Sequence, residues 1–101
     1  MIFITKEEDL NFDQICALYF YASWVPFHKK MLVMLNKMEE RYPIKYFAID
    51  IDNFSSIVKR FSIECVPTVL IFNKKELKRI KGLVLTSAFR KAFSDVIDNQ
   101  E

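Results

Sequence analysis

The stretch ICALYFYASWVPFHKK, residues 15–30, decides the fold, because a buried run passes directly into a helical pattern there. Residues 15–21 are almost continuously apolar, as expected of a strand that is buried on both faces. Pro26 fits the first turn of a helix, where its missing N–H costs nothing, and Pro43 ends that helix. Between them, apolar residues recur at spacings of three and four, which predicts an amphipathic helix: Phe27, Met31, Met34, Leu35, Met38 and Tyr42.

Strands and helices alternate through the rest of the chain. Apolar patterns predict further strands at residues 1–5, 44–50, 68–72 and 76–81, and helices at residues 6–14, 54–61 and from Thr86 onward. Thr5 and Glu8 suggest a capping box for the first helix, and Thr86 is a candidate cap for the last. Alternation forces parallel pairing, whereas the short turn at residues 73–76 forces an antiparallel pair. We therefore expect an α/β fold over residues 1–101, a single domain whose central mixed β-sheet is flanked by helices on both faces.

Composition excludes several classes of protein. The 101 residues are 51% hydrophobic and 28% charged, which suits a folded globule rather than a disordered chain. A net charge of +2 is too small to indicate nucleic-acid binding. The longest apolar stretch, residues 15–27, is shorter than the roughly 18 residues of a membrane span, and no signal peptide is visible. Because the two cysteines, Cys16 and Cys65, do not form a disulfide framework, we expect a cytoplasmic protein with reduced thiols.

Four short motifs, taken in order, resemble the thioredoxin family over almost the whole chain. YFYASW, residues 19–24, leads from a strand into a helix, and AIDIDN, residues 48–53, follows the next strand. Val66-Pro67-Thr68 matches the family's cis-proline loop, and Gly82 stands where a glycine packs beside that loop. The resemblance implies a thioredoxin fold with a cis bond between Val66 and Pro67. It also implies that the backbone of Val66 is exposed and can pair with an extended peptide.

The family's redox motif, W-C-G-P-C-K, aligns with W-V-P-F-H-K at residues 24–29. Val25 then occupies the position of the nucleophilic cysteine and His28 that of the resolving cysteine. The family's chemistry needs a thiolate at the first position and a second thiol to release the mixed disulfide. The buried acid of the family falls on Tyr19, its facing lysine on Ala48 and its helix proline on Val33. We therefore expect no catalytic residue here and no ordinary disulfide reductase activity.

What the resemblance leaves is an apolar, partly exposed surface, which we call the peptide groove. Surfaces of this kind favour the binding of a protein or a peptide. The groove is expected to comprise Trp24, Pro26, Phe27, Val66, Pro67 and Gly82.

Single residues with chemical potential have modest interpretations. His28 is expected to be a solvated surface side chain, and no second histidine or Cys/His spacing suggests a metal site. We also expect no cofactor. Cys16, in an apolar strand, is expected to be a core residue. Cys65 is expected to be an accessible thiol, and two roles stay open for it: a reduced spectator, or a thiol that links two monomers under oxidation, as in some thioredoxins that the chain resembles. The methionines at 31, 34 and 38 have the spacing of core residues.

Three functions remain open from the sequence. The first is a binding module that holds a protein or peptide in the peptide groove without redox chemistry. The second is an atypical thiol–disulfide oxidoreductase with a role in cell redox homeostasis, acting through Cys65 alone. The third is a structural subunit of a larger assembly.

Overall fold

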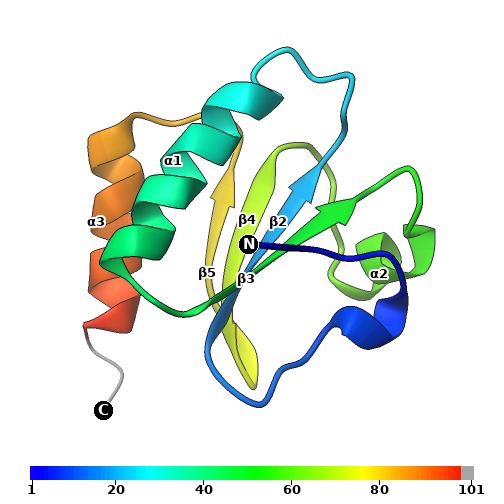
Figure 1. The fold of residues 1–101 in the computed structure, drawn as a ribbon, viewed down its shortest axis with the longest axis horizontal. Coiled ribbons are helices and arrows are strands. Elements are labelled where there is room, and N and C mark those ends of the chain that lie inside the picture. The colour runs from blue at the N-terminus through cyan, green and yellow to red at the C-terminus, as the bar shows by residue number, and fades with distance from the viewer. Residues whose placement is uncertain (99–101) are drawn as a thin grey trace.

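A five-stranded mixed sheet forms the centre of the molecule (Figure 1). The structure is a computed structural model, and it describes residues 1–98. Its strands run in the order β1-β3-β2-β4-β5, with β1, β3 and β2 parallel and β4 antiparallel to both β2 and β5. The elements are β1 (Ile2–Phe3), η1 (Glu7–Asp9), β2 (Cys16–Tyr21), α1 (His28–Arg41), β3 (Lys45–Asp50), α2 (Ser55–Arg60), β4 (Thr68–Asn73), β5 (Lys75–Lys81) and α3 (Thr86–Ile97).

Helices cover both faces of this sheet, as the alternation of elements predicted. Figure 1 shows α1 and α3 side by side on one face, with α2 on the other side of the sheet. Strand β2 divides the core, because successive side chains of a strand point to opposite faces. Ala17 and Tyr19 pack with α1 and α3, whereas Leu18 and Phe20 pack with α2. The near-continuous apolar run is thus explained by burial of β2 on both faces.

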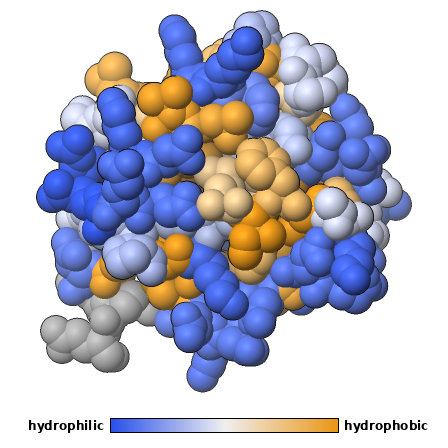
Figure 2. Space-filling view, viewed as in Figure 1, coloured by the Kyte–Doolittle hydropathy of each residue, from blue (hydrophilic) through white to orange (hydrophobic). Residues whose placement is uncertain are grey.

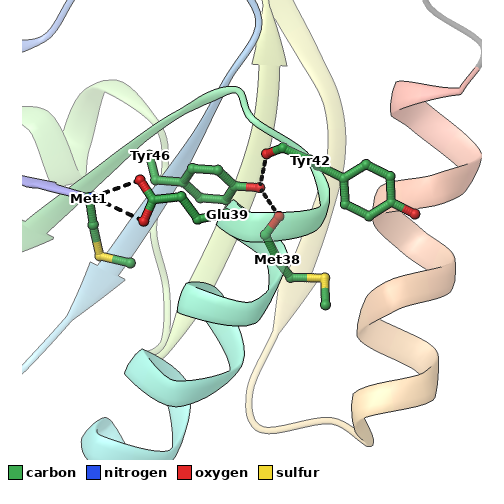
Figure 3. Close-up of polar contacts among 5 residues, drawn as sticks. All are labelled: Met1, Met38, Glu39, Tyr42 and Tyr46. Carbon is green, nitrogen blue, oxygen red and sulfur yellow. Dashed lines mark hydrogen bonds and ion pairs between the residues drawn. The ribbon is translucent and has the colours of Figure 1, made fainter.

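The C-terminal end of α1 is tied to the centre of the sheet (Figure 3). The buried hydroxyl of Tyr46, on β3, donates to the carbonyl oxygens of Met38 at 3.0 Å and Tyr42 at 2.8 Å. Burial raises the pKa of Tyr46, so its hydroxyl stays protonated and can donate. The ammonium group of Met1 forms an ion pair with Glu39 at 2.7 Å. These contacts hold α1 in place along the sheet.

Local structure differs from expectation near the N-terminus, where the predicted helix over residues 6–14 is wrong. Only one 3-10 turn, η1, forms there. Asp9, not Glu8, provides the cap: its carboxylate accepts the N–H groups of Thr5 at 2.8 Å and Lys6 at 3.3 Å. The side chain of Asn11 then accepts the N–H of Asp13 at 2.9 Å, a local bond that competes with helix continuation.

At the start of α3 the predicted cap is also wrong. Thr86 is the first helical residue, and Leu85 takes the capping position without a side-chain hydrogen bond. The methionines of α1 match expectation, since residues 31, 34 and 38 are all buried.

Apolar side chains are also exposed on the outside of the molecule. Figure 2 shows them gathered across the middle of one face, where Figure 1 places β1 and α1, between stretches of hydrophilic surface. The large apolar residues with the greatest exposure are Ile2, Phe3, Trp24, Val33, Leu83 and Leu85. Trp24 borders one hollow in the surface, whereas Val33, Leu83 and Leu85 border another.

Candidate functional site

The turn between β2 and α1 begins the candidate site. The N–H of Val25 donates to Ala22 at 3.1 Å, and the N–H of His28 donates to Val25 at 3.2 Å. These bonds turn the chain so that α1 begins at His28, with Phe27 in the capping position. Pro26 lies exposed in this turn, before the helix starts. The helix therefore presents His28, its first residue, toward the end of β2.

His28 is held by two tyrosines of β2, so its expected place as a solvated side chain is wrong. Its Nδ1 is hydrogen bonded to the hydroxyl of Tyr19 at 2.8 Å. Its ring stacks on Tyr21 with centroids 4.6 Å apart, and on Tyr19 at 5.8 Å. Residues 19 and 21 lie on the same face of the strand because side chains alternate. Since the first turn of α1 covers that face, His28 falls on both rings.

Burial sets the protonation of the two tyrosines. It raises the pKa of Tyr19, which is 2% exposed, and it also raises the pKa of Tyr21, with a smaller contribution from Asp50. Both hydroxyls are therefore neutral near pH 7. Tyr19 and His28 form a hydrogen bond with each other, but neither side chain can form a disulfide. The side chain of Val25 carries no nucleophile.

A cavity of about 310 Å³ lies beside this turn, and we call it the Trp24 cavity. Trp24 is 67% exposed, yet its ring is oriented, because Nε1 donates to the carboxylate of Asp52 at 3.0 Å. Asp52 is itself positioned by its N–H, which donates to Asp50 at 2.9 Å. The cavity is lined by Trp24, Ile51, Val58, Ile63, Glu64, Cys65 and Val66.

The loop that precedes β4 borders this cavity. The predicted cis bond between Val66 and Pro67 is present. The carbonyl of Pro67 accepts the N–H of Gly82 at 2.8 Å, so Gly82 does pack beside the loop. Gly82 has φ of +77°, a left-handed conformation that side chains disfavour, and a Cβ there would meet no atom within 4 Å. The backbone angle, not crowding, therefore requires glycine.

The structure brings together only part of the predicted peptide groove. Trp24 and Val66 line one cavity, and Pro67 is bonded to Gly82. Phe27 instead packs against the core beneath α1 and α3, and Pro26 is not among the lining residues of the cavity. Sequence reasoning missed the apolar wall formed by Ile51, Val58 and Ile63. The position of Ile51 within the run AIDIDN was the available signal.

The two cysteines have opposite surroundings. Cys16 is fully buried, and burial raises its pKa to about 11. Cys65 is exposed, and its carbonyl oxygen accepts the hydroxyl of Thr68 at 2.7 Å. A solvent-borne disulfide could therefore meet Cys65 but not Cys16.

Residues 1–98 hold neither a cluster of metal ligands nor a membrane-spanning helix. No group of three or more His, Cys, Asp or Glu side chains is placed to hold a metal ion in that part of the chain. None of its helices combines the length and apolar character that a membrane span requires.

Comparison with known proteins matches the chain to one family. The thioredoxin family model covers residues 5–95. Thioredoxin-1 of Saccharomyces cerevisiae is 29% identical over 72 residues, which cover 69% of this chain and 70% of the yeast protein. Thioredoxin 2 of Plasmodium berghei is 37% identical over 84 residues, which cover 76% of this chain but only 54% of that protein.

The fold is shared with solved structures as well. The crystal structure of thioredoxin from Trypanosoma brucei brucei superposes with a TM-score of 0.84 at 23% identity, covering 97% of this chain and 91% of that one. At 23% identity this similarity is evidence for the fold alone, and the sheet and helices of this chain form a thioredoxin fold.

Proposed function

The chain belongs to the thioredoxin family, and on that premise we propose that it is a binding module without the family's dithiol chemistry. In this proposal the exposed surface around Trp24 holds a protein or peptide segment. A cytoplasmic location and the absence of a cofactor belong to the same proposal.

One observation carries the proposal: a tyrosine–histidine pair stands where the alignment puts the family's acid and resolving cysteine. Tyr19 and His28 are hydrogen bonded at 2.8 Å, and Tyr21 packs on the same imidazole. A dithiol site needs two sulfurs that can approach bonding distance. Here the aligned positions carry Val25 and His28, and Cys16 is buried in the core. The contacts of His28 give it a role in packing the start of α1.

The Trp24 cavity supports the binding half of the proposal. Its walls are mainly apolar, and Trp24 offers a large ring held in one orientation by Asp52. Rigid, exposed aromatic side chains are typical anchors for a partner. Val66 is half-exposed at the rim, where an extended segment could pair with its backbone. The occupant that fits is an extended peptide with an apolar side chain directed into the cavity.

A reductase assay tests the first half of this function. We expect insulin disulfides to be reduced at the same rate by dithiothreitol with the protein as by dithiothreitol alone. Restoring cysteines through Val25→Cys and His28→Cys should give only partial activity, because Tyr19 replaces the buried acid. Turnover by the unmodified protein near that of an ordinary thioredoxin would contradict the proposal.

Peptide selection tests the second half. An unbiased library of extended peptides is selected on the protein and then counter-screened on Trp24→Ala. Phe3→Ala is the matched control, since Phe3 is another exposed aromatic residue, 49% exposed, on β1. We expect the enriched peptides to lose binding to Trp24→Ala and keep it with Phe3→Ala. Equal binding to both variants would remove the Trp24 cavity as the site.

The exposure of Cys65 favours one second candidate, a mixed-disulfide role. The Cys65 thiolate would attack a disulfide of another molecule, form a new sulfur–sulfur bond to it, and release the second sulfur as a thiol protonated by water. Because Cys16 is buried, it cannot attack the mixed disulfide at Cys65, so an external thiol such as glutathione would be needed to release the bound molecule. Oxidation should then give an intermolecular dimer or an adduct, which non-reducing electrophoresis detects. Persistence of the covalent dimer in Cys65→Ser would exclude this candidate.

A further inference from the structure

A second hollow, separate from the Trp24 cavity, lies between α1 and the loop from β5 to α3. Figure 1 shows this loop passing beside the first turns of α1. The hollow encloses about 470 Å³ and shares no lining residue with the Trp24 cavity. We call it the lysine groove. Its main walls are Lys30, Val33, Met34 and Lys37 of α1, with Leu83 and Leu85 of the loop.

The lysine groove exposes three large apolar side chains. Val33 is 55% exposed and Leu85 is 77% exposed, while Leu83 is 44% exposed. Met34, which is buried, lies at the base of the groove. Contiguous apolar side chains with a polar border mark surfaces that bind another molecule.

The charge around these apolar residues has one sign. Lys30, Val33, Met34 and Lys37 follow the spacing i, i+3, i+4, i+7, so they form a single stripe along α1. The two lysines stand at the ends of that stripe, about 10 Å apart at 1.5 Å per residue. Lys29 also lines the groove, and none of its lining residues is acidic. Over residues 1–98, these three lysines make no salt bridge.

We propose that the lysine groove docks an acidic amphipathic helix of a partner protein. The partner helix would carry two acidic residues seven positions apart with apolar residues between them, because such a helix repeats the spacing of Lys30, Val33, Met34 and Lys37. Its apolar side chains would enter the hollow and its carboxylates would pair with the two lysines. This surface does not depend on the proposed use of the Trp24 cavity.

The shape of the site favours a helix over an anionic membrane. Lysines beside exposed leucines also suit a lipid surface. A bilayer surface, however, does not fill a hollow of this size, whereas protruding side chains of a helix do. The bordering lysines on α1 also match a ligand with charges at fixed separation, which a fluid lipid surface does not impose.

The probe is a synthetic, fluorescently labelled peptide of about 18 residues, a length at which isolated helices are no longer marginal in water. It is built on the repeat Glu-x-x-Leu-Leu-x-x-Glu with alanine between, and its binding to the full chain is followed by fluorescence anisotropy. We expect one-to-one binding that weakens with added salt. The double variant Lys30→Glu with Lys37→Glu should weaken binding about fivefold or more, and Leu85→Ser should also weaken it.

A matched control separates specific pairing from general charge. Lys59→Glu with Lys75→Glu makes the same change in net charge at exposed sites outside the lysine groove and should bind as the unmodified protein does. A second peptide, with lysine in place of each glutamate, should prefer the Lys30→Glu/Lys37→Glu variant.

Four outcomes overturn the proposal. The first is no binding of the glutamate peptide, and the second is equal weakening by the control variant. The third is binding to phosphatidylserine vesicles that exceeds peptide binding and is lost in Lys30→Glu/Lys37→Glu, which would make the groove a membrane site. The fourth is self-association of the unmodified protein in sedimentation that is lost in Lys30→Glu/Lys37→Glu. That result would make the occupant of the groove a second copy of this chain.

Discussion

The hydrogen bond between Tyr19 and His28 can be measured by a double-mutant cycle. The perturbations are Tyr19→Phe, which removes the hydroxyl but keeps the ring, and His28→Ala, which removes the imidazole that bonds to this hydroxyl and stacks on the tyrosines. Tyr19 is 2% exposed and the bond is 2.8 Å long, so water cannot easily replace it. The pair therefore offers a direct test of how the start of α1 is held.

The expected magnitudes come from the contacts. A typical hydrogen bond contributes about 0.5–1.5 kcal/mol net, which is the expected loss for Tyr19→Phe. His28→Ala also loses ring contacts with Tyr21, worth about 0.5–1.5 kcal/mol, so its expected loss in free energy of unfolding is about 1–3 kcal/mol. The hydrogen bond is absent from both single variants and from the double variant. The coupling energy should therefore be about 0.5–1.5 kcal/mol.

Urea denaturation followed by circular dichroism at pH 7 gives the four free energies. A loss of 1 kcal/mol should lower Tm by about 4–8 °C in a domain of this size. Tyr21→Phe is the matched control: it keeps the ring that stacks on His28, and its hydroxyl makes no side-chain hydrogen bond within residues 1–98, so its effect should stay within about 0.5 kcal/mol. A coupling energy near zero, or a loss for Tyr21→Phe equal to that for Tyr19→Phe, would refute the reasoning.

Three further predictions concern stability. Tyr46→Phe removes two buried hydrogen bonds to the end of α1 and should lower the free energy of unfolding by about 1–3 kcal/mol. Tyr42→Phe, whose hydroxyl accepts only a 3.4 Å contact, should cost under about 0.5 kcal/mol in the same urea titration. Burial raises the pKa of Cys16 from 9.0 to about 11. The stability that the buried, protonated thiol contributes is therefore complete below pH 9 and is lost as pH rises through about 11. The fall in the free energy of unfolding over that range should be shallower in Cys16→Ala. Gly82→Ala places a side chain at φ of +77° and should cost about 1–2 kcal/mol by thermal melting, and no loss would mean that the loop relaxes freely.

Local patterns in the sequence were sufficient for all of the strands and for three of the four predicted helices, whereas the cis bond of the Pro67 loop was implied by the family that the chain resembles. The buried run at residues 15–21 predicted β2 within one residue at each end. The helical spacing after it predicted α1, but Pro26 was expected in its first turn and the helix starts two residues later, at His28. Gly82 was also placed correctly, because it lies next to Pro67 in the family pattern that the chain resembles. The strands and helices depend on periodicity, which neighbouring residues determine, whereas the Pro67 loop and Gly82 were placed by the resemblance to the family.

Local competition explains the failures near the N-terminus. Thr5 and Glu8 fitted a capping box, but Asp9 accepted the bonds, and the Asn11 side chain bonded the following backbone. Several residues in one short segment could satisfy the same donors. Spacing alone does not say which of them succeeds.

Only the tertiary structure decided what the site is made of. Trp24 meets Asp52 across 28 positions, and the lysine groove joins residues 30–37 to residues 83–85. His28 lies only nine positions from Tyr19, yet its contact depends on how the first turn of α1 crosses the face of β2. Sequence spacing shows which side chains share one strand or one helix, whereas the crossing of elements fixes which side chains meet between them. That is why the sequence indicated a missing dithiol at residues 25 and 28 but could not show that a tyrosine–histidine pair fills its place.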